Sequence, residues 1–349
     1  MNSQSPFQAP ALDLAVRVGC ELIYDTTADT PALVTLKPRH DALQSIRQES
    51  FHFEPQLTAT EFEDDHFNIV YRLVLRPGRN ALRYDAIVMV PSLREDFAWL
   101  DHPIPPHQLP ASILRYTLPT RYCDSDKLLD FAWQNFGHLH HGIERVLGII
   151  NWLHRNIEYR TLSGSPNLSA YDIIQRGYGV CRDLAHTAVA LCRTFNLPAR
   201  YVSGYVPDIG YQDPGTPNDF HAYCEVYLGG RWQVFDARFD QPRVGRIRIC
   251  SGYDAVNCAF TTVYGQAQLS NFEVWSYQVD PGEISIGDPI DLSKRLCGTP
   301  QIRFPYARSS TKKGCFRPDR RLTHCGLDKT AGTSRVKCPD RLSRVGHRE

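Results

Sequence analysis

The chain has 349 residues, of which 42% are hydrophobic and 22% are charged, a composition typical of a folded globular protein with room for two domains. Residues 305–349 hold 12 Lys and Arg against 4 Asp and Glu, so the formal charge of +1 combines a basic tail with a body of net charge −7. A mildly acidic body argues against a nucleic-acid surface as the main function of the protein.

Two features of the sequence bear on its compartment. The first residues have neither the basic start nor the continuous apolar core of a signal peptide, and no run approaches the roughly 18 apolar residues that span a bilayer. The eleven cysteines form an odd set without tight repeated spacing, which is a poor disulfide framework. We therefore expect a cytoplasmic protein with free thiols and no membrane partner.

Period-2 alternation of apolar residues dominates the first hundred residues. The segment "HFNIVYRLVLRPGRNALRYDAIVMVP" (66–91) alternates on both sides of Arg76-Pro77-Gly78, a pattern that predicts a hairpin with one buried face. The segments 12–25 and 32–38 behave similarly. We expect an N-terminal β-sandwich domain in residues 1–100, followed by a proline-rich linker in residues 101–124.

The period changes after this linker. Apolar residues at helical spacing predict helices over 143–157, 169–177 and 181–195, of which the second is capped by Ser169 and closed by Gly177. The alternation then returns in five predicted strands, 200–206, 220–228, 231–238, 259–265 and 272–279. Helices followed by antiparallel strands predict an α+β domain in residues 125–304, with a central helix packed on a sheet.

The sequence "RGYGVCRDLAHTAVALC" (176–192) places Cys181 where the third predicted helix begins. A helix N-terminus stabilises a thiolate and offers unpaired N–H groups to an oxyanion, and the two preceding glycines allow a close approach. A small buried structural cysteine would fit the same residues. This position alone therefore leaves both interpretations open.

A partner for the thiol comes from the strand register. If Gly229-Gly230 forms a two-residue hairpin loop in "DFHAYCEVYLGGRWQVFDAR", His221 and Asp236 occupy diagonal positions on the same face of the sheet. Diagonal neighbours are roughly 7–8 Å apart at the backbone, which is close enough for an imidazole and a carboxylate to meet. Cys181, His221 and Asp236 are thus a candidate catalytic triad, in which the carboxylate orients the imidazole.

These residues also carry a resemblance to a known family. The blocks "YGVCRDLAHTAVALCRTFNLPARYVSGY" and "DFHAYCEVYLGGRWQVFDAR" closely resemble the bacterial transglutaminase-like superfamily, whose members are often described as cysteine proteases. "INWLHRNIEYR", "GYDAVNCAFTTVYG" and the N-terminal β domain are also similar to that family, over roughly residues 11–303. The resemblance implies a papain-like or transglutaminase-like core with Cys181 as nucleophile, His221 as base and Asp236 as the orienting group.

The resemblance leaves the reaction open. Its members share one step, in which a thiolate attacks a carbonyl, an amine leaves and a thioester forms; water then gives hydrolysis, and a lysine amine gives a crosslink. We expect a thiol-dependent enzyme that hydrolyses peptide or isopeptide amides, with a protein-glutamine transglutaminase or deamidase as the alternative. A non-catalytic module whose β domain recruits a partner is the alternative outside the enzymes. No EF-hand loop is present, and we expect no cofactor or metal.

Several other residues have weaker claims to a role. Tyr159 could offer its hydroxyl to the oxyanion, by analogy with an aromatic donor in the superfamily, or could be a core or rim tyrosine. His186 is five residues beyond the nucleophile, and we expect it to pack or to face solvent. Cys192 and Cys224 lie on core-facing positions, and we expect them to be inert.

Two further segments could suggest a metal. His138, His140 and His141 lack cysteine or carboxylate ligands at suitable spacing. Residues 305–349 depart from the family pattern, and their sparse apolar residues predict a basic, disordered extension. A zinc site in that tail and nucleic-acid contact through it are the lesser alternatives; the zinc ligands would be His324, Cys315, Cys325 and Cys338.

Overall fold

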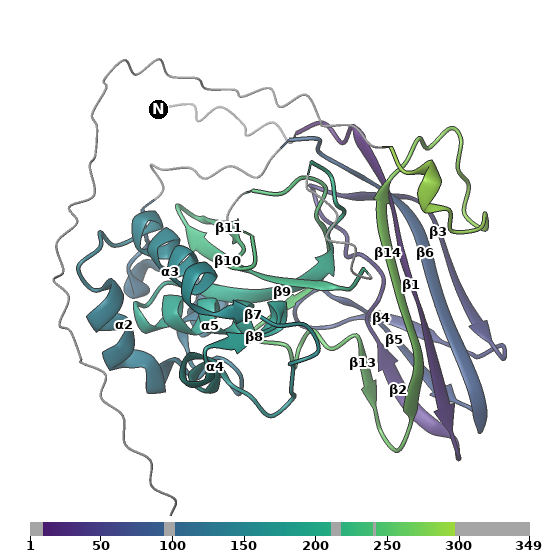
Figure 1. Cartoon of the computed structure of the whole chain (residues 1–349), viewed down its shortest axis with the longest axis horizontal. Coiled ribbons are helices and arrows are strands. Elements are labelled where there is room, and N and C mark those ends of the chain that lie inside the picture. Colours follow the sequence, from purple (N-terminus) through teal and green to yellow (C-terminus); the bar gives the residue numbers. More distant parts are fainter. Residues whose placement is uncertain (1–9, 94–101, 211–217, 240–241, 297–349) are drawn as a thin grey trace, which may run out of the picture. The chain divides into compact units, whose positions relative to one another are not determined.

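The computed structural model describes residues 10–93, 102–210, 218–239 and 242–296 (Figure 1). All of them belong to a compact unit that spans residues 1–303. The predicted tail, 305–349, and the zinc site considered for it lie outside the described residues.

The helices are α1 Ala111–Leu114, α2 Leu129–Phe136, α3 Ile143–Asn156, α4 Ala170–Arg176 and α5 Cys181–Thr194. The strands are β1 Leu14–Thr26, β2 Thr30–Val34, β3 Ser45–Glu54, β4 Thr60–Glu63, β5 Ile69–Leu75, β6 Gly78–Val90, β7 Glu158–Tyr159, β8 Tyr178–Gly179, β9 Ala199–Tyr205, β10 His221–Leu228, β11 Arg231–Phe235, β12 Ile247–Gly252, β13 Thr261–Val263 and β14 Gln268–Gln278.

Two four-stranded antiparallel sheets hold the N-terminal strands, with the strand orders β14-β1-β6-β3 and β13-β2-β5-β4 (Figure 1). Apolar side chains of both sheets meet in one buried cluster, for example Val18 of β1, Val34 of β2 and Leu75 of β5. Strands β1, β2, β5 and β6 turn alternate residues into that cluster, which is why period-2 alternation is so clear in this part of the sequence.

The hairpin predicted over residues 66–91 is wrong. β5 and β6 are strands, as predicted, but they belong to different sheets. The turn between them is held by the buried Asn80, whose side chain accepts a hydrogen bond from the Arg76 N–H at 2.9 Å and donates to the Arg76 carbonyl at 2.8 Å. Strands that cross between two facing sheets show the same alternation as strands that pair, so the pattern cannot separate the two cases.

The first two sheets also contain residues from the C-terminal part of the unit. β14 pairs with β1 along most of its length, and β13 pairs with β2. The predicted domain bounds at 1–100, 101–124 and 125–304 stay a prediction, and residues from both sides of them share these sheets. In the predicted linker, Tyr116 and Cys123 are buried against the rest of the unit.

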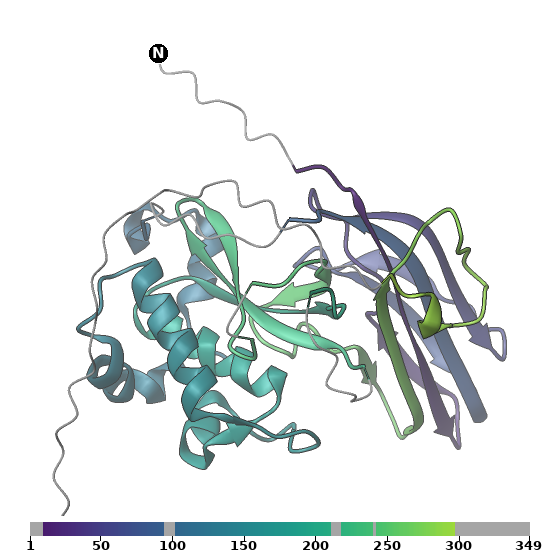
Figure 2. The same ribbon diagram turned by 45° about the horizontal axis from the view of Figure 1, so that its top comes forward.

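The third sheet has the order β11-β10-β9-β12 and is antiparallel throughout. Helix α5 packs on β9 and β10, and α3 and α4 pack against α5, so the helices gather on one side of the sheet (Figures 1 and 2). The predicted α+β arrangement with a central helix on an antiparallel sheet is therefore present. Helices 143–157, 169–177 and 181–195 are confirmed within one residue at their N-terminal ends.

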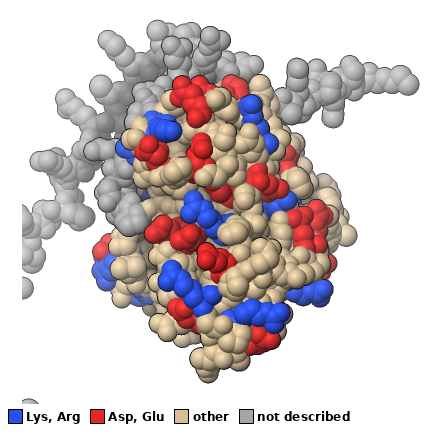
Figure 3. Space-filling view, turned by 90° about the vertical axis from the view of Figure 1, so that its right-hand side faces the viewer, with Lys and Arg blue, Asp and Glu red and all other residues tan. Residues whose placement is uncertain are grey.

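The surface of the first sheet mixes charges of both signs. Figure 3 shows Lys and Arg side chains interspersed with Asp and Glu on the face that it presents. A surface that binds the phosphate backbone would gather basic side chains on one face. Among the described residues, no helix is both long and apolar enough to cross a membrane.

Candidate active site

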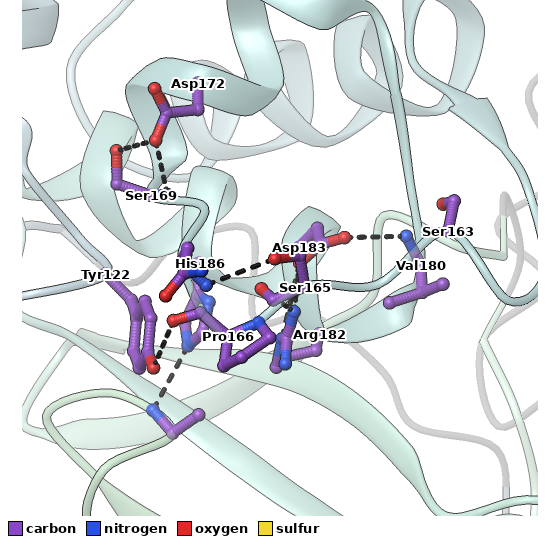
Figure 4. Close-up of polar contacts among 12 residues, drawn as sticks. Tyr122, Ser163, Ser165, Pro166, Ser169, Asp172, Val180, Arg182, Asp183 and His186 are labelled. Atoms are coloured by element: carbon purple, nitrogen blue, oxygen red, sulfur yellow. Dashed lines mark hydrogen bonds and ion pairs between the residues drawn. The ribbon is translucent and has the colours of Figure 1, made fainter.

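The turn before α5 depends on two glycines. Gly177 ends α4 in the left-handed region at φ +73°, where a side chain would be strained. A Cβ on Gly179 would lie 2.8 Å from the Cβ of Asp183, so only glycine fits at this approach. The Asp183 carboxylate accepts a hydrogen bond from the Val180 N–H at 3.0 Å and another from the Arg182 guanidinium at 3.0 Å (Figure 4). This turn therefore sets where Cys181 begins the helix.

Cys181 is the first residue of α5 and is partly exposed, whereas the six other described cysteines are buried; all seven are free thiols. Helix geometry leaves the N–H groups of its first turn without an intrahelical acceptor. The Cys181 thiol lies 3.9 Å from the Phe220 carbonyl oxygen and is also a hydrogen-bonding neighbour of the His221 imidazole. The thiol thus has an imidazole on one side and the positive end of a helix on the other.

His221 and Asp236 meet as the strand register predicts. Strands β10 and β11 form a hairpin with its loop at Gly229-Gly230, and their register runs from the pair Leu228–Arg231 to the pair Cys224–Phe235. His221 Nε2 lies 2.7 Å from Asp236 Oδ2, with the two residues 9% and 8% exposed. Burial lowers the pKa of His221, but the Asp236 carboxylate and the hydrogen bond to Cys181 outweigh it and raise the pKa to about 9.

Asp236 has two further partners that the sequence analysis missed. The Arg246 guanidinium donates to Asp236 Oδ2 at 2.7 Å, and the Arg238 backbone N–H donates to Oδ1 at 2.9 Å. Burial raises the pKa of the Asp236 carboxyl, and the charges of His221 and Arg246 more than reverse this, so the pKa lies well below its usual range. The carboxylate is therefore ionised at neutral pH.

The contact of Arg246 with Asp236 was not predicted, because the strand that follows Arg246 was not predicted either. The sequence "RIRIC" (246–250) alternates Arg246 and Arg248 with two buried isoleucines, which is the signal of a strand with one charged face. Arg248 continues this row, where it pairs with the buried Glu225 at 3.0 Å. Arg200 of β9 pairs with the same carboxylate at 2.6 Å. The sheet thus carries its ion pairs on the face that also holds His221.

Tyr159 lies beside the turn that precedes Cys181. β7 and β8 pair in parallel, with Tyr159 opposite Gly179, two residues before Cys181. The Arg238 guanidinium carbon stacks 3.7 Å from the centre of the Tyr159 ring, and the two side chains also share a hydrogen bond. Burial and the charge of Cys181 raise the pKa of Tyr159 to about 12, against the opposing effect of Arg238. Its hydroxyl therefore keeps its proton at neutral pH.

His186 is buried, and of the two predicted possibilities it takes the packed one. Its ring lies between those of Tyr122 and Tyr201, at centroid distances of 4.9 and 4.8 Å. Its Nε2 accepts a hydrogen bond from the Ala255 N–H at 3.1 Å (Figure 4), so this nitrogen carries no proton. Burial, together with Arg182 and Arg193, holds its pKa well below the usual value.

The other cysteines and histidines considered in the sequence analysis have packing or hydrogen-bonding contacts. Cys192 and Cys224 lie in the apolar cluster beneath α5, as predicted, and burial raises the pKa of Cys192 to about 12. The His141 ring contacts Arg145 at 3.0 Å. Within the described ranges, no group of three or more His, Cys, Asp or Glu side chains is arranged to hold a metal ion.

Comparison with known proteins agrees with this geometry. Residues 133–237 match the family model of the transglutaminase-like superfamily. The crystal structure of a candidate cysteine protease from Cytophaga hutchinsonii superposes with a TM-score of 0.70 and 30% identity, covering 76% of this chain and 91% of that one. The kyphoscoliosis peptidase of Homo sapiens is 27% identical over 133 residues, which are 36% of this chain and 19% of the human protein.

An uncharacterised protein of Mycobacterium leprae is 25% identical over 119 residues, which are 33% of this chain and 42% of that protein. The chain thus spans less than half the length of both curated relatives. The Cytophaga structure, in contrast, is matched over nearly its whole length, and the family match encloses the turn before Cys181 and the strands β10 and β11. The chain belongs to the transglutaminase-like superfamily.

Proposed function

We propose that the protein is a thiol-dependent acyl-transfer enzyme that acts on peptide or isopeptide amides, with Cys181 as nucleophile, His221 as base and Asp236 as the group that orients it. The observation that supports this most is the 2.7 Å contact between His221 Nε2 and Asp236 Oδ2, next to a partly exposed thiol at a helix N-terminus. A base held by a carboxylate beside a nucleophile is the arrangement that covalent catalysis requires.

The proposed reaction has two halves. Proton transfer from the Cys181 thiol to His221 gives a thiolate, which attacks the amide carbon, while the first N–H groups of α5 and the Tyr159 hydroxyl stabilise the oxyanion. The C–N bond then breaks, the leaving amine takes the proton from His221, and a thioester remains on Cys181. In the second half His221 removes a proton from water, whose attack releases a carboxylic acid and the free thiol.

Hydrolysis is favoured over amine transfer by the relatives. The Cytophaga protein is described as a candidate cysteine protease, and the human relative is named a peptidase. A protein-glutamine transglutaminase or a deamidase remains the second candidate function, because the thioester accepts an amine as readily as water in chemical terms.

We also propose that the first two sheets form a β-sandwich, since their buried residues share one cluster, and that the protein is cytoplasmic.

Alkylation of Cys181 tests the activated thiol. Iodoacetamide should modify Cys181 at pH 6 at least about 100-fold faster than free cysteine, because a thiol without a cationic partner is less than about 1% thiolate there. The His221→Ala variant should lose this advantage, and peptide mapping should assign the label to Cys181. A rate equal to that of free cysteine, unchanged in His221→Ala, would leave a non-catalytic module as the better account.

A second assay separates the two reactions. The protein is incubated with a glutamine-containing peptide library and a labelled primary amine, with Cys181→Ser as the matched control. Peptide cleavage or ammonia release without amine incorporation supports hydrolysis. If the amine is incorporated, and Cys181→Ser abolishes this incorporation, transglutamination replaces hydrolysis as the proposed reaction.

A further inference from the structure

Arg238 differs from the other arginines near the site. Arg246, Arg182 and Arg160 each have an acidic partner, namely Asp236, Asp183 and Glu158. Within the described residues, the Arg238 guanidinium forms no ion pair. Its side-chain contacts there are the Tyr159 ring and hydroxyl and the Phe239 ring.

The position of Arg238 is fixed at both ends. Its backbone N–H donates to Asp236 Oδ1, and its guanidinium lies over Tyr159, whose strand partner Gly179 is two residues before Cys181. The side chain therefore extends from the carboxylate end of the triad to the turn that carries the nucleophile. The residue is only partly buried.

We propose that Arg238 is a substrate-binding residue, and that the enzyme selects amides that carry a carboxylate close to the scissile bond. This inference rests on the proposed function. An arginine held by stacking on an aromatic ring keeps several N–H donors free, and its planar fork matches the two oxygens of a carboxylate. The ammonium group of a flexible lysine would also attract a carboxylate, but it would fix the orientation of that carboxylate less well.

Asp219 gives the site a second charge of opposite sign. The charge of Asp219 helps to raise the pKa of Tyr159, and burial raises the pKa of Asp219 itself against the opposing effects of the Phe220 N–H and the charge of His221. A carboxylate near Asp219 would be repelled, whereas one near Arg238 would be attracted.

Two alkylating agents that differ in one charge test the proposal without knowledge of the natural substrate. Iodoacetate and iodoacetamide deliver the same carbon to Cys181, and the ratio of their rates reports the local preference for a carboxylate. We expect Arg238→Gln to lower this ratio about tenfold at low ionic strength, since opposite charges a few ångströms apart at a partly exposed site are worth about that factor. Arg238→Lys should keep most of the ratio, and Asp219→Asn should raise it.

Arg160→Gln is the matched control for the general electrostatic field, because Arg160 follows Tyr159 directly but is exposed and paired with Glu158. An unchanged ratio in Arg238→Gln, or an equal fall in Arg160→Gln, would overturn the proposal. Slow alkylation by iodoacetamide in the unmodified protein would instead contradict the proposed function. The two failures are thus separate.

The carboxylate could belong to an acidic side chain or to a free peptide C-terminus, and peptide pairs distinguish these sources. One pair carries Glu or Gln next to the scissile amide, and the other ends in a free carboxylate or a carboxamide. We expect kcat/KM to favour the acid in at least one pair about tenfold, and Arg238→Gln to abolish that preference. Equal kcat/KM values in both pairs would refute the selectivity.

Discussion

Two buried histidines lie close to the start of α5, and the pKa values of their rings are shifted in opposite directions. His221 has a carboxylate at 2.7 Å and a thiol beside it, which raise its pKa to about 9. His186 has a backbone N–H at Nε2 and a tyrosine ring on each face, and its pKa lies well below the usual value. The two residues are 9% and 1% exposed, so both rings are shielded from water.

The comparison shows that partners rather than burial decide the charge of these rings. Burial alone disfavours the imidazolium in both places. At His221 an ionised carboxylate reverses the effect, whereas at His186 an N–H donor requires a neutral acceptor nitrogen. The surroundings of His221 therefore favour the protonated ring, and those of His186 favour the neutral ring that accepts the Ala255 N–H.

The largest expected effect is on thiol reactivity. His221→Ala should lower the rate of Cys181 alkylation by iodoacetamide at pH 6 about 100-fold or more, because the thiolate loses its cationic partner. His186→Gln, which retains an acceptor, should change the rate less than about threefold. Pseudo-first-order rates of mass increase measure both, with circular dichroism as the check of folding. Equal losses in the two variants would remove the distinction between the histidines.

The second effect is on stability against pH. His221 has a folded pKa of about 9, above the roughly 6.5 of an unfolded chain, so its contribution is complete below pH 6.5 and is lost as pH rises through 9. We expect the free energy of unfolding to fall by about 2–3 kcal/mol between pH 6.5 and 9.5 from this residue. Urea unfolding of the wild type and His221→Gln measures it, and the variant should lack this component. Parallel curves would show that folding does not raise the pKa of His221.

A third, smaller effect concerns the neutral ring. His186→Leu keeps the volume between the two tyrosines but leaves the Ala255 N–H without its acceptor, which should cost about 1–2 kcal/mol of stability. His186→Gln should lose less, because its amide oxygen can accept the bond. Urea midpoints at pH 7 provide the measurement. A stabilised His186→Leu would show that the hydrogen bond contributes nothing.

The local patterns of the sequence predict the elements better than their connections. The helix that begins at Cys181 follows from its apolar spacing, and the β10–β11 register follows from Gly229-Gly230, so the His221–Asp236 contact could be anticipated. The separation of β5 and β6 into different sheets could not be anticipated, because the apolar alternation of paired strands is the same as that of strands in two facing sheets. The pairing of β14 with β1 joins residues some 250 positions apart, which no local signal encodes.

Polar contacts between residues far apart in the chain could not be predicted from the sequence either. Arg238 and Arg246 both contact Asp236, one through its backbone and one through its side chain, but only the fold brings Arg246 to the carboxylate. His186 could be placed on the helix that begins at Cys181 from the sequence, yet its neutral state depends on Ala255, 69 residues away. The type of each residue limits what it can do, and the partner that the fold supplies decides which of those roles it takes.

Arg246 sharpens the comparison, because it shares the carboxylate that charges His221. Asp236 Oδ2 accepts hydrogen bonds from both His221 Nε2 and the Arg246 guanidinium, each at 2.7 Å. Arg246→Gln keeps a donor but removes a positive charge, so His221 should experience more of the carboxylate charge and hold its proton to higher pH. The alkaline fall in the iodoacetate rate, which follows loss of the imidazolium, should move upward by as much as about one pH unit.

Arg246→Lys is the matched variant, since it retains the charge while it changes the geometry. Its alkaline limb should stay within about 0.3 pH units of the wild type if charge rather than shape sets the titration. Rates between pH 7 and 10 give the profiles, and the ratio to iodoacetamide corrects for intrinsic thiol reactivity. A limb that stays in place in Arg246→Gln, or moves down, would mean that Arg246 only anchors Asp236. In that case the charge of His221 would be set by the carboxylate and the thiol alone, and the contrast with His186 would depend on fewer residues.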